Sequence, residues 1–239
     1  RGAGLFRGTG TLTVLIHFVG AGPGDSELIT VKGARLLGEA DLVVFAGSLV
    51  DLELVRRYSP DAQLFDSAGM TLAETTKVLA DAAFSGKRAV RLHTGDPSIY
   101  GAIQEQMAEL DRLGVDYGVV PGVTSAFAAA ATLKQELTLP EVSQTVIITR
   151  MAGRTPVPER ENLAAIARIG ATLVIYLSVS MIEDVVLQLL SGGYPPDTPV
   201  AVVSRASWRD ERVVEGSVAD IATKIRDAGI GKQAVILVG

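Results

Sequence analysis

The sequence predicts an α/β protein built from two α/β domains with a ligand cleft between them. Two observations carry the fold class: apolar runs alternate with stretches of helical spacing, and this alternation resumes after a break at Pro121-Gly122. The length of 239 residues allows two hydrophobic cores. We therefore expect a first domain at residues 13–121, a second at residues 122–239, and a largely parallel sheet.

In the first half, five short apolar runs rich in Val, Leu and Phe predict strands. They are Val14–Val19, Leu42–Phe45, Gln63–Asp66, Ala89–His93 and Tyr117–Val120. Helical spacing of apolar residues predicts helices at Glu27–Leu37, Leu52–Arg57, Thr71–Ser85 and Ile103–Leu113. Thr71 and Glu74 have the spacing of a capping box, and Gly114 is placed to end the fourth helix.

The second half begins with a predicted helix of small residues, Ser125–Leu133. Strands are expected at Val146–Thr149, Thr172–Leu177, Pro199–Val203, Glu211–Gly216 and Ala234–Val238. Helices are expected after Asn162 and at Ile182–Leu190 and Ser217–Asp227, whereas Met151–Glu161, with Gly153, Pro156 and Pro158, is expected to form a loop.

Composition excludes several classes of function. The net charge of −5 gives no general affinity for nucleic acid or for an acidic membrane, and no apolar run reaches the ~20 residues that span a bilayer. The absence of cysteine excludes disulfides, thiolate metal sites and thiol nucleophiles, which fits a cytoplasmic protein. We expect no metal site. Residues 1–12 are interpreted as a flexible extension or a cloning remnant.

Three loops rich in glycine and small polar residues each follow a predicted strand. They are Gly20-Ala21-Gly22-Pro23-Gly24-Asp25, Thr94-Gly95-Asp96-Pro97-Ser98-Ile99-Tyr100-Gly101 and Pro121-Gly122-Val123-Thr124-Ser125. The carboxyl ends of parallel strands meet at one edge of a sheet, so all three loops should line one cavity.

The first loop departs from the dinucleotide-binding fingerprint. Asp25 stands where the third glycine of G-x-G-x-x-G is required, and Pro23 stiffens a loop whose N–H groups should face a pyrophosphate. The second strand also ends in Phe45-Ala46-Gly47, without the acidic residue that binds the ribose. A nicotinamide-dependent oxidoreductase is therefore the weaker alternative.

The three loops together resemble those of the tetrapyrrole methylase family, in order and in spacing, and the similarity covers Val14–Gly239. Three further stretches are similar to the branch that acts on corrin precursors: Val44–Val50, Thr149–Pro156 and Ser204–Trp208. The resemblance implies a homodimeric methyltransferase that takes a methyl group from S-adenosylmethionine, releases S-adenosylhomocysteine and acts on a tetrapyrrole. A non-catalytic tetrapyrrole-binding relative is the alternative from another class.

The resemblance also implies where the cofactor binds. Glycine loops, apolar side chains and backbone groups suit an adenosine and a cationic sulfonium. The implied cofactor-binding residues are Pro23, Thr94, Gly95, Asp96, Ile99, Thr124, Ser125, Leu177, Ala206 and Ala234.

Substrate binding and proton transfer have fewer candidates. Arg150, Arg154 and Arg205 could bind the carboxylates of a tetrapyrrole through their forked guanidinium groups, although a solvated face is the ordinary alternative. Family members that act on uroporphyrinogen carry an aspartate at the position of Ala46, so no base can be transferred from them. Asp66, at the end of a predicted strand, is the candidate base.

Three of the residues named above also have ordinary structural interpretations. His93 is expected to be a core or edge histidine, whereas Asp96 could equally cap a helix. Trp208, the only tryptophan, could be ordinary packing or a wall for a macrocycle.

Overall fold

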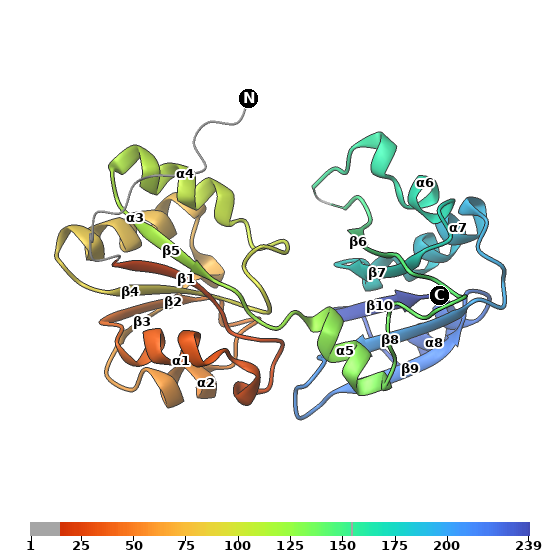
Figure 1. The fold of residues 1–239 in the computed structure, drawn as a ribbon, viewed down its shortest axis with the longest axis horizontal. Coiled ribbons are helices and arrows are strands. Elements are labelled where there is room, and N and C mark those ends of the chain that lie inside the picture. The colour runs from red at the N-terminus through yellow and green to blue at the C-terminus, as the bar shows by residue number, and fades with distance from the viewer. Residues whose placement is uncertain (1–14, 154) are drawn as a thin grey trace. The chain divides into compact units, whose positions relative to one another are not determined.

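The computed structural model describes residues 15–153 and 155–239, and in it the chain divides into two units (Figure 1). The first unit comprises the chain through Gly22 together with Ser26–Val123. The second comprises Pro23–Asp25 together with Thr124–Gly239. The chain thus enters the second unit and returns within the first glycine loop, before it finally leaves the first unit after Val123. The extension expected at residues 1–12 lies outside the described residues.

The first unit contains a parallel sheet of five strands in the order β3-β2-β4-β1-β5. The strands are β1 (Ile16–Gly20), β2 (Leu42–Phe45), β3 (Gln63–Asp66), β4 (Ala89–His93) and β5 (Tyr117–Val120). The helices are α1 (Val31–Gly38), α2 (Leu52–Tyr58), α3 (Leu72–Phe84) and α4 (Ile103–Leu113), with 3-10 turns at Ser26–Leu28 and Ser67–Gly69. The predicted bounds of β2 to β5 and of α4 are confirmed.

Helices cover both faces of this sheet, as Figure 1 shows. On one face, α1 and α2 pack Leu37 and Val55 against Val43 and Val90 of the sheet. On the other face, α3 and α4 pack Leu79 and Leu110 against Phe18. Strands buried on both faces are largely apolar, which is why β2, with all four residues buried, does not alternate with polar residues.

The predicted helix Glu27–Leu37 is wrong in its first turns. The chain forms a 3-10 turn at Ser26–Leu28, and α1 begins only after Thr30, whose Oγ1 accepts the backbone N–H of Gly33 at 3.0 Å. This cap satisfies one of the N–H groups that a helix leaves unpaired, and it therefore fixes the start of the helix. The predicted capping box at Thr71 and Glu74 and the left-handed C-cap at Gly114 are confirmed.

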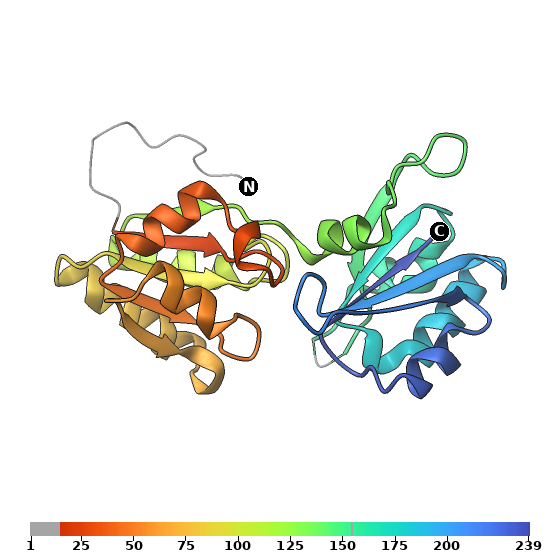
Figure 2. The same cartoon turned by 90° about the horizontal axis from the view of Figure 1, so that it is seen from below.

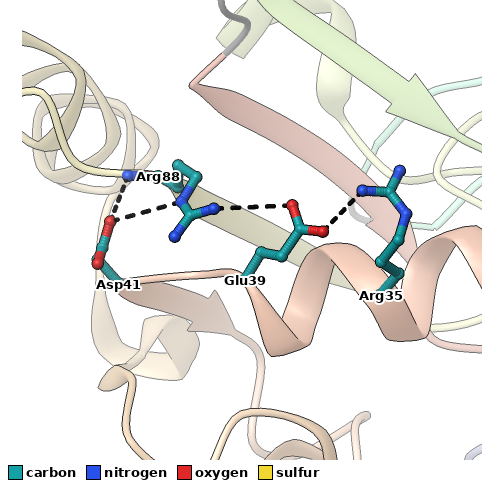
Figure 3. Close-up of polar contacts among 4 residues, drawn as sticks. All are labelled: Arg35, Glu39, Asp41 and Arg88. Atoms are coloured by element: carbon teal, nitrogen blue, oxygen red, sulfur yellow. Dashed lines mark hydrogen bonds and ion pairs between the residues drawn. The ribbon is translucent and has the colours of Figure 1, made fainter.

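A chain of charged side chains ties α1 to the starts of β2 and β4 (Figure 3). Arg35 contacts Glu39 at 2.8 Å, and Arg88 lies 3.7 Å from Glu39. Asp41 accepts the backbone N–H of Arg88 at 2.8 Å and lies 4.0 Å from its guanidinium Nε. The side chains are about half exposed, so the ion pairs contribute little beyond the backbone hydrogen bond. They lie at the amino ends of the strands, away from the glycine loops.

The second unit contains a sheet in the order β6-β7-β10-β8-β9. Its strands are β6 (Val146–Arg150), β7 (Thr172–Tyr176), β8 (Pro199–Ser204), β9 (Arg212–Ser217) and β10 (Ala234–Val238). Its helices are α5 (Ser125–Leu133), α6 (Leu163–Ala167), α7 (Ile182–Gly192) and α8 (Ile221–Asp227), with 3-10 turns at Glu159–Glu161 and Val179–Met181. The predicted α5 and β10 are confirmed, and α8 begins later than predicted because β9 runs through Ser217.

The second sheet is not the largely parallel sheet that the alternation predicts. Only β6 and β7 pair in parallel; β10 is antiparallel to both β7 and β8, and β8 is antiparallel to β9. A parallel pair needs a crossover of a dozen or more residues, whereas only residues 205–211 join β8 to β9. The short connection therefore forces an antiparallel hairpin.

This sheet also has helices on both faces (Figure 2). The helices α6, α7 and α8 bury Leu163, Val185 and Ile221 against one face. On the other face, α5 packs its small residues Ala126 and Ala129 against the sheet. No helix in residues 15–153 or 155–239 is long and apolar enough to cross a membrane.

Candidate functional site

A first set of predicted site residues lies at the carboxyl edge of the first sheet. The strands β4, β1 and β5 are neighbours, so the loops that follow them leave the sheet side by side. These are the three glycine loops predicted to meet, and within the first unit they do. Gly95 donates its N–H to the carbonyl of Gly22 at 2.8 Å, and Ala21 donates to the carbonyl of His93 at 2.7 Å.

Glycine is required here because backbone packs directly on backbone. A Cβ on Gly20 would lie 2.5 Å from the carbonyl oxygen of Gly95 and 2.6 Å from the Cα of Gly122. A Cβ on Gly122 would lie 2.1 Å from the same carbonyl oxygen. Real Cβ atoms do not approach backbone so closely, and a side chain at either position would therefore separate the loops.

Asp96 fastens two of these loops together. Its Oδ1 accepts the N–H of Ser98 at 2.8 Å, within its own turn, and its Oδ2 accepts the N–H of Gly122 at 2.9 Å, across to the loop after β5. Both oxygens of the carboxylate are thus used to shape the backbone. Thr94 is exposed at the edge of the same loop, Gly95 is buried with a φ of 61°, and Ile99 is half-buried.

Asp66 also organises a turn. Its Oδ1 accepts the backbone N–H groups of Gly47 and Ala68, both at 2.9 Å. These two hydrogen bonds, that of Gly47 first, lower the pKa of the carboxyl group because they favour its charged form. A lower pKa makes the exposed Asp66 a weaker proton acceptor than an ordinary aspartate.

A buried polar group lies beneath the loop that follows β4. His93 is 8% exposed and Gln106 of α4 is 2% exposed, and the Nε2 of His93 and the Oε1 of Gln106 have no hydrogen-bond partner. Burial, followed by the neighbouring Arg91 charge, lowers the pKa of His93 to about 3, so its imidazole is neutral at ordinary pH. The Nε2 of Gln106 donates to the carbonyl of Ala102, a residue in the left-handed region with φ 49°. Gln106 thereby supports the loop from below.

A second set of predicted site residues lies at one edge of the second sheet. Arg150 at the end of β6 is in register with Tyr176 at the end of β7, and Ala234 at the start of β10 is in register with Ser204 at the end of β8. Because β10 runs against β7 and β8, its first residue lies beside their last ones. Within the second unit, the sheet therefore brings the segments of Arg150, Leu177, Arg205, Ala206 and Ala234 to one edge.

This edge is lined by strained backbone. The backbone of Leu177 lies in the left-handed region, with a φ of 54°, and the residue is 66% exposed, so its apolar side chain faces solvent. Arg205, Ser207 and Gln233 also have positive φ values, of 51°, 65° and 52°. Each such residue costs on the order of 1 kcal/mol or more, and clusters of them occur where a precise position matters more than stability.

The start of α5 is anchored at the same edge by Tyr176. Its hydroxyl accepts the N–H of Ala126 at 2.9 Å and shares a hydrogen bond of 2.5 Å with the Oγ1 of Thr124. Thr124 is buried and Ser125 half-buried at the first turn of the helix. The hydroxyl of Tyr176 therefore fixes Thr124, a predicted cofactor-binding residue, and also Ala126, two residues further along. The apolar pattern of its strand does not reveal this task.

The tip of the first glycine loop also belongs to this second set. The indole Nε1 of Trp208 donates to the carbonyl of Pro23 at 2.8 Å, and Asp25 donates its N–H to the Oγ of Ser207 at 3.0 Å. Ala206, 3% exposed, lies in the same turn as these two partners. The structure thus brings Pro23 to the turn that carries Ala206.

The predicted substrate arginines differ in their surroundings. Arg205 is occupied: its Nε contacts Asp210 at 2.7 Å, its Nη1 donates to Gln233, and its guanidinium stacks 4.1 Å from the centre of the Trp208 ring. Arg150 donates to the carbonyls of Met151, Thr155 and Pro156, all of which are neutral. Arg154 lies outside the described residues. Of the two that are described, Arg150 is therefore the better candidate for attracting an anion.

Sequence reasoning missed Tyr176, Gln106 and Ser207, whose contacts hold the loops and turns of their own units. Each is an ordinary residue of a strand end, a helix or a turn, and no sequence pattern marks it. Across the described residues there is no group of three or more His, Cys, Asp or Glu side chains arranged to hold a metal ion.

The family model of tetrapyrrole (corrin/porphyrin) methylases matches residues 15–222. The cobalt-precorrin-4 C(11)-methyltransferase of Methanocaldococcus jannaschii is 56% identical over 94% of this chain and 86% of its own length. The precorrin-4 C(11)-methyltransferase of Mycobacterium tuberculosis is 49% identical over 94% of this chain and 90% of its own length.

Two solved structures share the fold over most of their length. The X-ray structure of a cobalamin biosynthetic enzyme, cobalt precorrin-4 methyltransferase, matches with a TM-score of 0.91 at 49% identity, covering 94% of each chain. The uroporphyrin-III C-methyltransferase of Thermus thermophilus, complexed with S-adenosyl homocysteine, matches with a TM-score of 0.77 at 30% identity, covering 94% of this chain and 91% of its own.

The first prediction concerns the glycine contact. Replacing Gly122 by alanine should lower the free energy of unfolding by about 2–3 kcal/mol, because its Cβ would meet the Gly95 carbonyl oxygen. Urea denaturation measures the change. Gly69→Ala is the control: no atom lies within 4 Å of its Cβ, so its stability should stay within about 0.5 kcal/mol of the wild type. Equal stabilities of the two variants would contradict the proposed close packing.

The second prediction concerns pH. The pKa of His93 is about 3 in the folded chain, against an ordinary histidine value of 6.5, so the unfolded chain binds a proton here as the pH falls below 6.5. Stability should therefore fall by about 2 kcal/mol between pH 7 and pH 5 from this group alone. Urea denaturation at both pH values should show a smaller loss for His93→Gln than for the wild type. An identical pH dependence would show that His93 is not buried as a neutral imidazole.

Proposed function

The chain belongs to the tetrapyrrole (corrin/porphyrin) methylase family, and we propose that it transfers the methyl group of S-adenosylmethionine to C-11 of precorrin-4 in cobalamin biosynthesis. The alternative substrate is cobalt-precorrin-4, since relatives at 56% and 49% identity carry the two names. The observation that carries the proposal is this identity over 94% of the chain, together with the three glycine loops that meet at the first sheet. A nicotinamide-dependent oxidoreductase is not consistent with this family.

The residues that would hold S-adenosylmethionine fit its chemistry. The ten proposed cofactor-binding residues contain no lysine or arginine, which suits a permanent sulfonium cation. Leu177 offers an exposed apolar surface for an adenosine, and the backbone of Ala206 and Ala234 lies at the same sheet edge. Thr94, Gly95 and Ile99 belong to the loop after β4, and Asp96 supports that loop through its own hydrogen bonds.

The bound cofactor supplies a methyl group on a sulfonium, which is already a strong electrophile. The protein then needs little acid–base machinery, and its contribution is to hold the reacting groups in line and to exclude water. The rigid backbone contacts of Gly20, Gly95 and Gly122 and the hydroxyl of Tyr176 serve this purpose, because they fix the loops before any ligand arrives.

For the substrate, the proposed residues are Arg150, Arg154 and Arg205. We assign the main role to Arg150, whose described hydrogen bonds go to neutral carbonyls and leave its charge uncompensated by them. Arg205, paired with Asp210, is better suited to hold Trp208. Asp66 remains the candidate base, though its lowered pKa favours a role in shaping the turn.

We further propose that the protein acts as a homodimer in the cytoplasm. The competing function is that of a non-catalytic tetrapyrrole-binding protein. It would bind a tetrapyrrole without turnover.

Calorimetric titration with S-adenosylhomocysteine tests the proposal, with NADH as the matched negative ligand. Saturable binding of S-adenosylhomocysteine and none of NADH is the expected result. Incubation of the enzyme with S-adenosylmethionine and each of the two precorrins, followed by mass analysis, should then show the addition of one methyl group. Binding of NADH alone would overturn the proposed function, whereas binding without methyl transfer would favour the non-catalytic alternative.

A further prediction concerns Leu177. Leu177→Gly should relieve the strain of the positive φ and raise the free energy of unfolding by up to about 1 kcal/mol. It should also weaken the binding of S-adenosylhomocysteine about tenfold or more, because it removes an apolar contact. Lys134→Gly is the matched control, because Lys134 has φ 53° at the end of α5 and is not among the proposed ligand contacts. It should gain stability and keep the affinity. Unchanged affinity in Leu177→Gly would remove Leu177 from the site.

A further inference from the structure

The turn at residues 205–211 holds Trp208 in a fixed place in the second unit. Its guanidinium neighbour Arg205 stacks at 4.1 Å from the ring centre and is itself held by Asp210 and Gln233. Trp208 donates its backbone N–H to the carbonyl of Arg205 at 2.9 Å, and Glu211 donates its own to the carbonyl of Trp208 at 3.1 Å. The indole therefore has little freedom to move.

The same turn is tied down at a second point. The carboxylate of Glu211 accepts the N–H of Ser207 at 2.5 Å and the hydroxyl of Thr132 at 3.0 Å. Arg205 and Ser207, both with positive φ, enclose the buried Ala206 between them. Two strained residues in three positions are tolerated only where the surrounding contacts hold them, and here those contacts also hold the indole.

Trp208 explains why residue 24 is glycine. Gly24 has no positive φ, so its backbone conformation does not require glycine. A Cβ on Gly24 would lie 2.2 Å from the Cδ1 of Trp208 and 2.5 Å from its Nε1. The glycine is needed because the flat indole lies directly on the backbone of the loop. This reason differs from that for Gly22, whose φ is 83°.

Three contacts thus seat residues 23–25 on this turn: the indole N–H on the carbonyl of Pro23, the indole ring on Gly24, and Ser207 on the N–H of Asp25. We propose that Trp208 is a positioning residue, which holds the Pro23–Asp25 segment beside Ala206 so that both can contact the methyl donor. This inference rests on the proposed function for its ligand. It assigns to Trp208 a task other than ordinary packing or contact with the macrocycle.

A double-mutant cycle tests the proposal, with S-adenosylhomocysteine as the probe and calorimetry as the measurement. Gly24→Ala in the wild-type background should weaken binding at least tenfold, because its methyl group displaces the segment from the indole. In the Trp208→Ala background the same change should alter the affinity less than twofold, because the space is then open. Equal losses of affinity in both backgrounds would overturn the proposal.

Two further variants separate positioning from folding. Trp208→Phe keeps an aromatic ring beside Arg205 but loses the indole N–H. It should weaken the binding of S-adenosylhomocysteine about three- to tenfold, which is less than the effect of Trp208→Ala, and its melting temperature should be similar to that of the wild type. Gly231→Ala is the control glycine, since its Cβ meets no atom within 4 Å, and it should bind as the wild type does. Loss of affinity in proportion to loss of melting temperature across all variants would instead indicate a purely structural tryptophan.

The outcome can be separated from that of the proposed function. If the wild type does not bind S-adenosylhomocysteine, the proposed function fails. Amide hydrogen exchange then tests whether Trp208 holds residues 23–25 in place. The N–H of Asp25 should be protected in the wild type and should exchange at least tenfold faster in Trp208→Ala. Unchanged exchange would overturn the positioning role.

Discussion

The close contact of three backbone segments at Gly20, Gly95 and Gly122 is the constraint on which the loops of the first unit depend. Side chains cannot enter this contact, so the three loops have one relative arrangement, and Asp96 fastens it through the N–H of Gly122. The positions of Thr94 and Ile99 follow from it. A site built on backbone packing is rigid before a ligand binds, which lowers the entropy lost on binding.

The predicted site residues of the second unit are held by a different physical means. Here polar side chains hold the backbone or the neighbouring side chains. Tyr176 accepts the N–H of Ala126 at the start of α5, and Glu211 accepts that of Ser207, whose φ is positive. Arg205, which also has a positive φ, stacks on the ring of Trp208. The apolar cores that pack against the two sheets stabilise the fold, and this stability offsets the cost of the strained backbone. Local stability is thus given up at the sheet edge in exchange for fixed positions.

Much of the fold could be predicted from the sequence because β2, β3, β4 and β5 are short apolar runs bounded by turn residues, and because Thr71 and Gly114 mark helix ends. The predicted start of α1 at Glu27 is wrong, since Thr30 caps the helix and the residues before it form a 3-10 turn at Ser26–Leu28. The antiparallel pairing of β10 could not be predicted, because strand order depends on contacts between segments far apart in the chain.

The candidate site shows the same division. The glycine loops were visible as a pattern, and their meeting followed from the rule for parallel strands. The roles of Tyr176 and Gln106 were not visible, because a hydroxyl or an amide acts through a partner distant in sequence. Arg205 was predicted to meet a substrate carboxylate, and only the structure reveals Asp210 and Trp208 as its partners.

The assignment of Pro23–Asp25 to the second unit has a consequence for recombination of these genes. A breakpoint between the codons of Val123 and Thr124 falls where the chain finally leaves the first unit, yet it separates Gly24 from Trp208, whose ring lies against it. A chimera made there inherits its loop from one parent and its indole from the other. If the parents differ at either position, the hybrid has either a side chain at residue 24 that clashes with the indole ring or a Gly24 with no indole packed against it. Exchange at this boundary is therefore restricted to relatives that match at both positions.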